Sequence, residues 1–464
     1  MDANFFPQTA ELLRFLPEII LTIAGTLLLV VEGYKKEHDS RSSIVTLTAI
    51  AIGLAMYGTV VAYQTPGMAF SNMLISDGYA AFFRLVVLAV GLLTVLSSSA
   101  YLEREKSNTG EFYVLILFSL AGQCLMVAAN ELMMVFIGLE VSSIASYILA
   151  GYLRDDKRGN EASLKYFLLG SFATAFLLYG VAWIYGMTGS TNLLEIREAI
   201  TKGVPSMTMV SAAAGLMLVG FAFKISAAPF QGWAPDVYQG APAPVSGFLS
   251  AGPKAAAFAV MIRVFQTAFE SLTPRWEPVL WTMALATMTI GNFAALWQNN
   301  IKRMLGYSSI AHAGYVLVAV TTHSSTGTAA AMFYLAAYAL MNYGAFAIVT
   351  HVAGKGEGRV TLDDMKGLSQ REPSVAAMLT VFLLSLIGVP LTALGLLNSA
   401  VAAYYYLRVL VVTYMHEPET TEHPTAIPSG LKITMWVTAA ATLVLGVFPG
   451  LVLDFATRFA VLNK

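Results

Sequence analysis

The chain has 464 residues, of which 57% are apolar and 12% are charged, and its formal net charge at pH 7 is −1. Soluble domains contain roughly 45–50% apolar and about 25% charged residues, so this chain has too little charge to coat a soluble globule of its size. The composition therefore excludes a soluble domain and indicates an all-α polytopic membrane protein. No basic block of the kind used to bind nucleic acid is present.

Apolar runs between polar breaks predict fourteen membrane-spanning helices, because a helix needs about 20 apolar residues to cross a bilayer. In chain order, the predicted spans cover residues 15–33, 44–63, 79–101, 112–129, 131–152, 163–187, 206–229, 243–266, 278–297, 303–322, 328–353, 374–391, 393–415 and 431–453. The first span follows acidic as well as basic residues, and no small-residue cleavage site follows it. We therefore expect it to stay in the mature chain and not to act as a signal peptide.

Lysines and arginines between the predicted spans indicate the orientation of the chain. Loops after odd-numbered spans hold fifteen of them, whereas loops after even-numbered spans hold only Arg197, Lys202 and Arg275. Because cytoplasmic loops retain positive charge, we expect the odd loops in the cytoplasm and both ends of the chain outside. Six basic residues fall inside the spans: Arg84, Lys165, Lys224, Lys254, Arg263 and Arg408. For the three arginines, ion pairs between helices are the default interpretation.

Two short motifs recur in order along the chain. The sequence Ser142-Ser-Ile-Ala145 in the fifth span recurs 166 residues later as Ser308-Ser-Ile-Ala311 in the tenth. Ser226-Ala-Ala-Pro229 in the seventh span resembles Ile387-Gly-Val-Pro390 in the twelfth, 161 residues later. These matches predict that spans four to eight are duplicated as spans nine to thirteen, and an odd number of spans inverts the second copy in the membrane. The expected parts are an N-terminal three-helix segment (1–111), a first five-helix repeat (112–266), a second inverted repeat (278–415) and a C-terminal loop with the last helix (416–464).

The second repeat is shorter than the first. Arg263-Val264 matches Arg408-Val409 at an offset of only 145 residues, so the second copy has lost roughly sixteen to twenty residues after Pro390. In this alignment Lys254 of the first copy faces Ser399 of the second.

Three ionisable side chains fall deep inside predicted spans. Glu140 lies nine residues into its span, about 14 Å along a helix, where a carboxylate costs several kcal/mol unless it is paired or protonated. Lys224 precedes Pro229, which breaks the helix and leaves free carbonyls beside a buried ammonium. Lys254 lies about halfway along its span. Structural ion pairs are the alternative, but we expect functional roles for all three.

The remaining polar groups inside spans allow two interpretations each. His312 lies nine residues into the tenth span, where it is either a proton carrier or a hydrogen-bonded core histidine. Lys165 begins the sixth span, and a lysine there can easily extend to the headgroups, so function and structure are equally supported. Tyr334, Tyr338 and Asn342 share one helix face, which could hold water or join helices.

These groups together favour proton transfer. Burial disfavours the charged forms of lysine and glutamate, which brings each closer to the neutral form in which a proton can be exchanged. An ionised Glu140 near Lys224 would restore the charge, so moving the two together or apart would load or unload the lysine. A protonated lysine cannot ligate a cation, so this pattern favours protons over sodium.

Other chemistry is not supported by the sequence. A single cysteine, Cys124, excludes a disulfide or a cysteine-ligated iron–sulfur cluster within the chain. No Walker loop occurs, and only one of the six histidines lies deep in a span, so neither nucleotide nor haem binding is expected. We expect no cofactor and no metal in this chain.

The segment from Phe230 to Lys254, FQGWAPDVYQGAPAPVSGFLSAGPK, closely resembles the antiporter-like membrane subunits of respiratory complex I. Residues 161–170, 301–312 and 398–408 extend this resemblance over nearly the whole chain. The chain is similar to the shorter members of the family, since no long lateral helix follows the last predicted span.

The resemblance implies a proton-translocating subunit of NADH-quinone oxidoreductase in the bacterial inner membrane, bound to other membrane-arm subunits. NADH and quinone would be used elsewhere in the complex, because subunits of this type carry no redox centre. Glu140 and Lys224 would be the modulating pair, Lys254 the central lysine and His312 part of the axis into the second half. Lys165 matches another lysine of the same row.

The sequence departs from the family after Pro390. There the family continues with a Gly-Phe-x-Gly-Lys segment whose lysine ends the row, whereas here Leu391-Thr-Ala393 leads directly into the thirteenth predicted span. Two other functions therefore stay open. One is a subunit of the related multisubunit cation/proton antiporters, and the other is a structural complex I subunit that does not pump protons.

Overall fold

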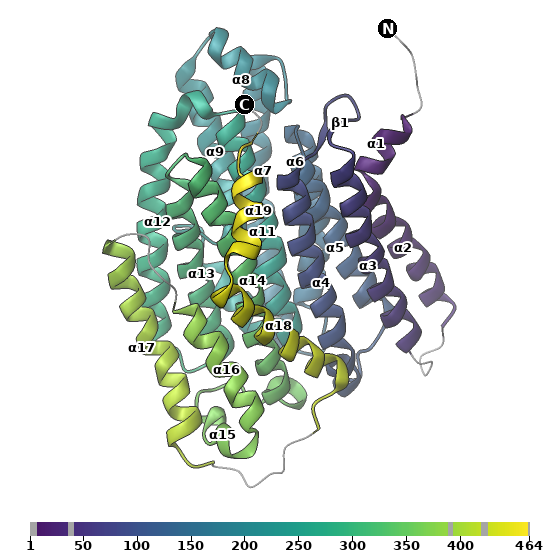
Figure 1. Cartoon of the computed structure of the whole chain (residues 1–464), viewed down its shortest axis with the longest axis vertical. Helices are drawn as coiled ribbons and strands as arrows, with labels where there is room; N and C mark the ends of the chain where they lie inside the picture. The colour runs from purple at the N-terminus through teal and green to yellow at the C-terminus, as the bar shows by residue number, and fades with distance from the viewer. Residues whose placement is uncertain (1–6, 36–40, 388–392, 419–425, 463–464) are drawn as a thin grey trace.

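The computed structural model describes residues 7–35, 41–387, 393–418 and 426–462. These residues form a tall bundle of nineteen α-helices, with one small β-ribbon beside the N-terminal helices (Figure 1). The all-α membrane fold predicted from composition is confirmed. The junction from Pro390 to Thr392, where the sequence predicts a lost segment, lies outside the described residues.

The N-terminal segment contains four helices and the ribbon. Its elements are α1 (Thr9–Arg14), α2 (Leu16–Gly33), α3 (Ser42–Gln64), β1 (Gly67–Ala69), β2 (Leu74–Ser76) and α4 (Gly78–Arg104). The two strands pair antiparallel, with Met68 opposite Ile75. Asp77 begins α4 by accepting a hydrogen bond from the backbone nitrogen of Ala80 at 2.7 Å, which satisfies one of the free N–H groups of the first turn.

The first half of the bundle follows. It consists of α5 (Gly110–Ala128), α6 (Leu132–Ala150), α7 (Lys157–Thr188), α8 (Leu193–Lys202), α9 (Met207–Ile225), α10 (Trp233–Gly240) and α11 (Ala243–Thr267). The span predicted over 206–229 is thus interrupted before Pro229, and the short helix α10 lies between α7 and α13. The predicted discontinuous helix is therefore present.

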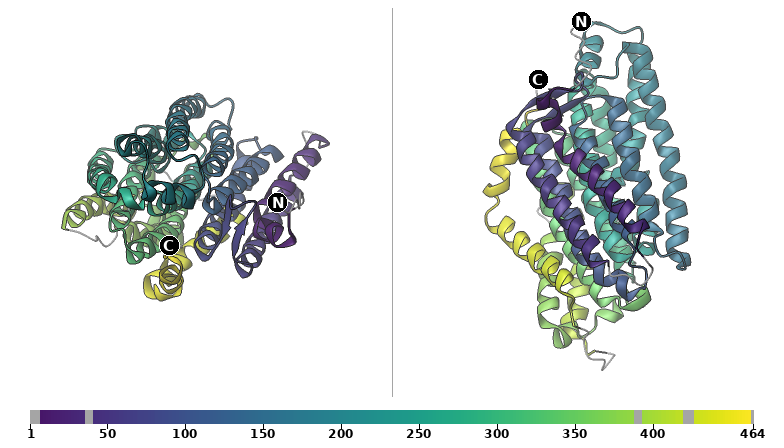
Figure 2. Two further views of the ribbon diagram at one scale, coloured as in Figure 1. Left: turned by 90° about the horizontal axis from the view of Figure 1, so that it is seen from above. Right: turned by 90° about the vertical axis from the view of Figure 1, so that its right-hand side faces the viewer.

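The second half and the C-terminal region complete the chain. They consist of η1 (Glu270–Leu272), α12 (Thr273–Leu296), α13 (Ile301–Val320), α14 (Ser325–Val352), η2 (Lys355–Glu357), η3 (Asp363–Met365), α15 (Leu368–Arg371), α16 (Pro373–Leu386), α17 (Ala393–Met415), α18 (Ser429–Val447) and α19 (Gly450–Phe459). α18 crosses the bundle obliquely and contacts α4, α14 and α16, so it joins the N-terminal segment to the second half (Figures 1 and 2).

Every one of the fourteen predicted spans falls on a helix, and twelve helices among the described residues have the length and hydropathy of a membrane span. The two remaining predicted spans correspond to α13 and α16. Lysine, arginine, serine and histidine side chains lower the hydropathy of α13, and α16 has only 14 residues. Each membrane-spanning helix is therefore where the sequence predicts it, and the described part of the twelfth predicted span is helical as far as Leu386.

Helix α11 is the centre of the molecule. Its membrane-spanning window is completely buried, and it contacts α4, α5, α9, α13 and α14. A helix that is apolar on all sides is expected in such a position. Because every side of α11 meets protein, a polar group on it must find its partner inside the protein and not in lipid.

Two helix pairs pack closely through glycine. A Cβ atom at Gly122 of α5 would lie 2.6 Å from the backbone nitrogen of Ser142 in α6. In the second half, a Cβ atom at Gly291 of α12 would lie 2.5 Å from the backbone nitrogen of Ala311 in α13. Small residues let helix backbones approach in a membrane, where dispersion contacts replace the hydrophobic effect as the driving force. The approach fixes the positions of the Ser-Ser-Ile-Ala motifs on α6 and α13.

The arginines inside spans have structural partners. Arg84 forms a buried ion pair with Glu18 at 2.6 Å, and Arg263 contacts Asp77 at 2.8 Å. Arg408 donates instead to the Leu296 carbonyl and to the side chain of Asn299. Arg84 and Arg263 therefore form the predicted ion pairs, whereas Arg408 is described with hydrogen bonds at the end of α12.

Candidate functional site

Lys224 lies at the break between α9 and α10. It is the second-last residue of α9, and Ser226 after it adopts a left-handed conformation with φ of 61° that ends the helix. Its side chain is 4% exposed, and Nζ donates to the Ser143 hydroxyl at 2.8 Å and to the Tyr166 hydroxyl at 3.3 Å. The ammonium is thus held by neutral hydroxyl groups from two other helices.

Aromatic rings enclose this lysine. The Tyr166 ring stacks on Trp233 of α10 with centroids 4.4 Å apart, and Lys224 Nζ lies 5.5 Å from the Tyr166 centroid. The indole N–H of Trp233 donates to the Phe223 carbonyl at 2.9 Å, which satisfies one of the carbonyls freed where α9 ends. Trp233 therefore both fills the space at the break and stabilises the helix end.

Glu140 lies on α6, one turn before Ser143. Residues three apart on a helix share one face, so its carboxylate points towards the Lys224 side. Among the described residues no ion pair joins Glu140 to Lys224, which is held instead by the Ser143 and Tyr166 hydroxyls. The Glu140 Oε1 atom is buried and has no hydrogen-bond partner among the described residues. The structure thus brings the predicted pair close without direct contact.

Lys254 lies in the middle of α11 and is 2% exposed. Its Nζ donates to the Ser309 carbonyl at 2.9 Å and also to the Ser309 hydroxyl. Pro253 before it has no N–H to donate to the carbonyl of Leu249, and the Tyr238 hydroxyl approaches that oxygen at 3.5 Å. Lys224 and Lys254 therefore end on the second serine of the two Ser-Ser-Ile-Ala motifs.

His312 lies on α13, one turn after Ser309, and is 2% exposed. Its Nδ1 atom lies 2.7 Å from the Tyr334 hydroxyl and its Nε2 atom 3.2 Å from the Tyr406 hydroxyl. One ring nitrogen of a neutral histidine donates and the other accepts, and a hydroxyl can take either role. The Tyr406 hydroxyl also hydrogen-bonds to Ser308, so His312 is part of a chain of neutral groups.

Lys165 lies apart from the other predicted residues. Its side chain is 43% exposed, and it contacts Glu161 at 2.7 Å and Asp236 at 2.9 Å. Asp236 also binds Arg303 of α13 at 2.5 Å. Partial burial raises the pKa of the Asp236 carboxyl, but the hydrogen bonds from Lys165 and Arg303 outweigh it and hold this pKa below its ordinary value. Lys165 therefore connects α7 to α10.

Sequence reasoning missed several partners of these groups. The serines that hold the two lysines were visible as a repeated motif, but their role depends on tertiary contacts. The aromatic residues that surround Lys224 and His312 carry no local signal in a chain that is 11% aromatic. These partners are Ser143, Ser309, Tyr166, Trp233 and Tyr406.

A buried ion pair near the start of α11 has a structural role. Lys302 contacts Glu357, whose Oε1 atom also accepts from the Tyr101 hydroxyl at 2.7 Å and from the backbone nitrogen of Ala243 at 2.6 Å. Glu357 therefore caps α11. No group of three or more histidine, cysteine, aspartate or glutamate side chains that could hold a metal occurs among the described residues.

The sequence and fold match a group of known membrane proteins. A family model described as NADH:quinone oxidoreductase/Mrp antiporter, transmembrane, matches residues 129–415. NADH-quinone oxidoreductase subunit N 1 of Solibacter usitatus is 58% identical over 479 aligned positions that cover 98% of both chains. The subunit N of Trichlorobacter lovleyi is 44% identical over 483 positions and 99% of both chains. A chain of respiratory complex I from Thermus thermophilus superposes with a TM-score of 0.79 at 33% identity, covering 95% of this chain and 99% of that chain.

The two sequence alignments also bear on the length of the chain. Both are longer than the 464 residues of this protein, although they cover almost all of it and almost all of the relatives. The relatives therefore hold positions that have no counterpart here. The offsets between the repeated motifs predict a shortening after Pro390, which stays a prediction.

Proposed function

The chain belongs to the NADH:quinone oxidoreductase/Mrp antiporter family of transmembrane proteins, and we propose that Glu140, Lys224, Lys254 and His312 carry protons through it. The protein is a multi-pass subunit of the bacterial inner membrane. In this proposal it works within NADH-quinone oxidoreductase, where other subunits of the membrane arm bind it. NADH and quinone react elsewhere in the complex, and this chain supplies only the path for protons.

The proposal rests on one observation about the two central lysines. Both are almost completely buried, and each is held by the hydroxyl of an equivalent serine with no carboxylate in contact. A lysine held by neutral groups inside a protein has no fixed countercharge, so it can lose its proton without leaving an unpaired carboxylate behind. A purely structural lysine would instead be paired, as Lys302 is with Glu357.

Glu140 has the position of a modulator in this proposal. Glu140 lies one helical turn from Ser143, which holds Lys224, and it forms no ion pair with this lysine among the described residues. A carboxylate near a buried ammonium favours the charged form of that ammonium. A shift of α6 relative to α9 changes the distance between the two groups and therefore changes how tightly Lys224 holds its proton. Such a shift is the kind of movement by which events in a neighbouring subunit can reach this site.

His312 continues the path into the second half. It lies one helical turn from Ser309, the serine that holds Lys254. Its two ring nitrogens face hydroxyls on different helices, so it can accept a proton on one side and release one on the other. Lys165 lies outside this path, and we propose only that it positions α10.

Replacement of Lys254 tests the proposal. The complex that contains Lys254→Met is reconstituted into liposomes, and the number of protons moved per NADH oxidised is measured from the pH change. We expect this ratio to fall, because methionine preserves the packing but cannot carry a proton. Lys202→Met is the matched control, since Lys202 is 72% exposed and pairs with Glu198 on the same helix, α8. An unchanged ratio for Lys254→Met in an assembled, active complex would overturn the proposal.

A further inference from the structure

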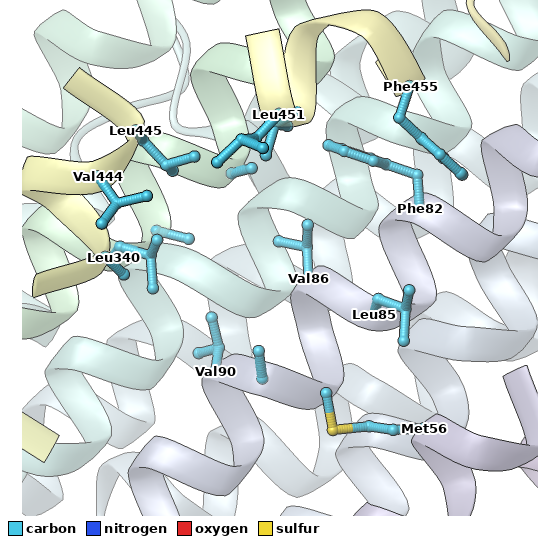
Figure 3. Close-up of a pocket in the computed structure, with 15 residues that line it drawn as sticks. Met56, Phe82, Leu85, Val86, Val90, Leu340, Val444, Leu445, Leu451 and Phe455 are labelled. Atoms are coloured by element: carbon cyan, nitrogen blue, oxygen red, sulfur yellow. The ribbon is translucent and has the colours of Figure 1, made fainter. Parts of the chain in front are cut away.

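An apolar groove of about 490 Å³ lies between α3, α4, α14, α18 and α19 (Figure 3). Its walls include Met56, Phe82 and Leu340, and none of the described side chains that line it carries a hydroxyl, amide or charged group. Two further lining residues, Val444 and Leu451, are 44% and 68% exposed, so the groove opens onto the surface of the bundle. Four of its five helices have the length and hydropathy of a membrane span, so this opening lies at the depth of the lipid tails.

The groove exists because α18 and α19 contact α4 at their far ends and bend away from it where they meet (Figures 1 and 2). At the beginning of α18, a Cβ atom on Gly430 would lie 2.2 Å from the Leu96 carbonyl oxygen of α4. At the end of α19, the Phe459 ring packs so closely that a Cβ atom on Gly78 would lie 2.1 Å from it. Both ends are therefore held tightly against α4, and the space between them belongs to the bend.

Neither water nor empty space suits this groove. Water needs two to four polar partners, which the lining side chains do not offer. Empty space would deprive the lining atoms of dispersion contacts on one side. An apolar cavity of about 150 Å³ holds one benzene molecule, so the groove has room for roughly twenty carbon atoms, the size of one acyl chain. The surrounding bilayer supplies such chains, and an apolar chain leaves no polar group unsatisfied there.

The groove lies in one half of the membrane. It follows α4 from Phe82 to Val90, about 12 Å along the helix axis, and Phe82 is in the second turn of α4. The beginning of α4 lies beside the end of α19, on the side of the bundle where both ends of the chain are found (Figure 1). Loop charge predicts that this side faces outward, so the groove is at the level of the outer leaflet.

A positive charge lies at the outer end of the groove. Arg458 is in the last turn of α19, three residues after Phe455, so it shares a helix face with a residue that lines the groove. Its side chain is exposed. Asp454 lies one turn earlier, but no ion pair joins it to Arg458 in the described part of α19. A free guanidinium is well suited to bind a phosphate through two parallel hydrogen bonds.

We propose that this groove binds one acyl chain of a phospholipid from the outer leaflet, with the lipid phosphate against Arg458. The chain fills the bend and connects α18 and α19 to the N-terminal segment and to α14. Leu340 lines the groove and follows Tyr338 by two residues, which places the two side chains on opposite sides of α14. Since the Tyr338 ring packs on His312, the lipid supports α14 from the side away from this histidine.

Photochemical labelling tests for the lipid. The intact complex is equilibrated with a phosphatidylglycerol that carries a diazirine in its acyl chain, and bulk lipid is then exchanged for detergent. Samples are irradiated at intervals, and cross-linked positions are identified by mass spectrometry. A bound chain leaves at its own dissociation rate, so we expect label at Leu451 to be lost at least about tenfold more slowly than label at Leu54 of α3. Leu54 is 53% exposed and lies outside the groove. Equal rates of loss, or retention of quinone in place of phospholipid, would overturn the proposal.

Variants that fill the groove test where the chain binds. Ala89→Phe and Ala441→Phe add a ring from opposite walls, so each is expected to abolish the slowly lost label at Leu451, and either one suffices if the other does not assemble. Ala440→Phe is the matched control, because Ala440 is exposed on the same helix as Ala441 and does not line the groove. Retained label in an assembled filling variant, or its loss in the control as well, would contradict binding in the groove.

Two charge variants test the position of the phosphate. We expect Arg458→Gln to speed the loss of label severalfold, because it removes the charge that holds the lipid phosphate at the outer end of the groove. Lys432→Gln is the control, since Lys432 is exposed at the beginning of α18, towards the other leaflet. Faster loss with Lys432→Gln and not with Arg458→Gln would place the lipid in the inner leaflet and overturn the proposal.

Discussion

The repeated sequence motifs predict one backbone plan for both halves of the bundle, and the two halves differ at the helix break. In the first half, Lys224 precedes the break and is enclosed by Ser143, Tyr166 and Trp233. In the second half, Ser385 has the equivalent position by the motif offset and lines a cavity of about 520 Å³ between α14, α16 and α18. The difference shows that one arrangement holds a charge among packed neutral groups, whereas the other offers space and hydroxyls without a charge.

The two halves are similar in how close helix packing positions the Ser-Ser-Ile-Ala motifs on α6 and α13. Glycines in α5 and α12 bring these helices against α6 and α13, so both motifs are placed by close backbone contact. The second serine of each motif accepts a hydrogen bond from a lysine. Lys254 belongs to the first half but binds Ser309 in the second half. The two halves are therefore connected through α11.

The largest expected effect comes from opening the packed break. Trp233→Ala removes the ring that stacks on Tyr166 and the N–H that binds the Phe223 carbonyl. Replacing a buried tryptophan by alanine costs about 3–5 kcal/mol, so we expect a clear fall in the thermal midpoint of the purified complex. The matched variant in the second half is Leu384→Ala, whose side chain is 47% exposed and should change the midpoint far less. Equal losses would mean that the two breaks are packed alike.

The serine variants sharpen the comparison between the lysines. Ser143→Ala removes the closest hydrogen bond of Lys224, and hydrogen bonds to charged groups contribute about 1.5–3 kcal/mol. Ser309→Ala leaves the Ser309 carbonyl in place as a partner for Lys254 at 2.9 Å. We therefore expect Ser143→Ala to lower the rate of proton translocation more than Ser309→Ala. A larger effect of Ser309→Ala would contradict the assigned partners.

Glu140→Gln tests the modulating role with a smaller change in structure. Glutamine keeps the size of the side chain but removes the negative charge one helical turn from Ser143, the serine that holds Lys224. We expect the rate of NADH-driven proton translocation to fall severalfold while the complex stays assembled. Glu131→Gln, on the same helix but engaged in capping α6, is the control that should leave the rate unchanged. A fall for both variants would assign Glu140 a structural role.

The smallest expected effect is that of Lys165→Gln. Lys165 is partly exposed, and Asp236 keeps Arg303 as a partner when the lysine is lost. Surface ion pairs contribute little to stability, so both the thermal midpoint and the proton ratio should stay within error. A loss of translocation as large as that of a central lysine would return Lys165 to the proton path.

The sequence predicted the helices well because the bilayer imposes a simple rule on length and hydropathy. It also located Lys224 and Lys254, because a charge deep in an apolar run is costly and has to be explained. It could not predict that Ser143 and Ser309 would hold these lysines, nor that Tyr334 and Tyr406 would flank His312. Such contacts join helices far apart in the chain, and their geometry depends on packing that local patterns do not encode.

The central claim is that Lys224 and Lys254 act in series on one proton path. The most direct test compares Lys224→Met, Lys254→Met and the double variant in reconstituted complexes, with protons moved per NADH oxidised as the readout. Groups that act as a unit give effects that do not add, so the account predicts that the double variant is no worse than the more impaired single variant. Independent losses that add in the double variant would show two separate paths and would contradict the account.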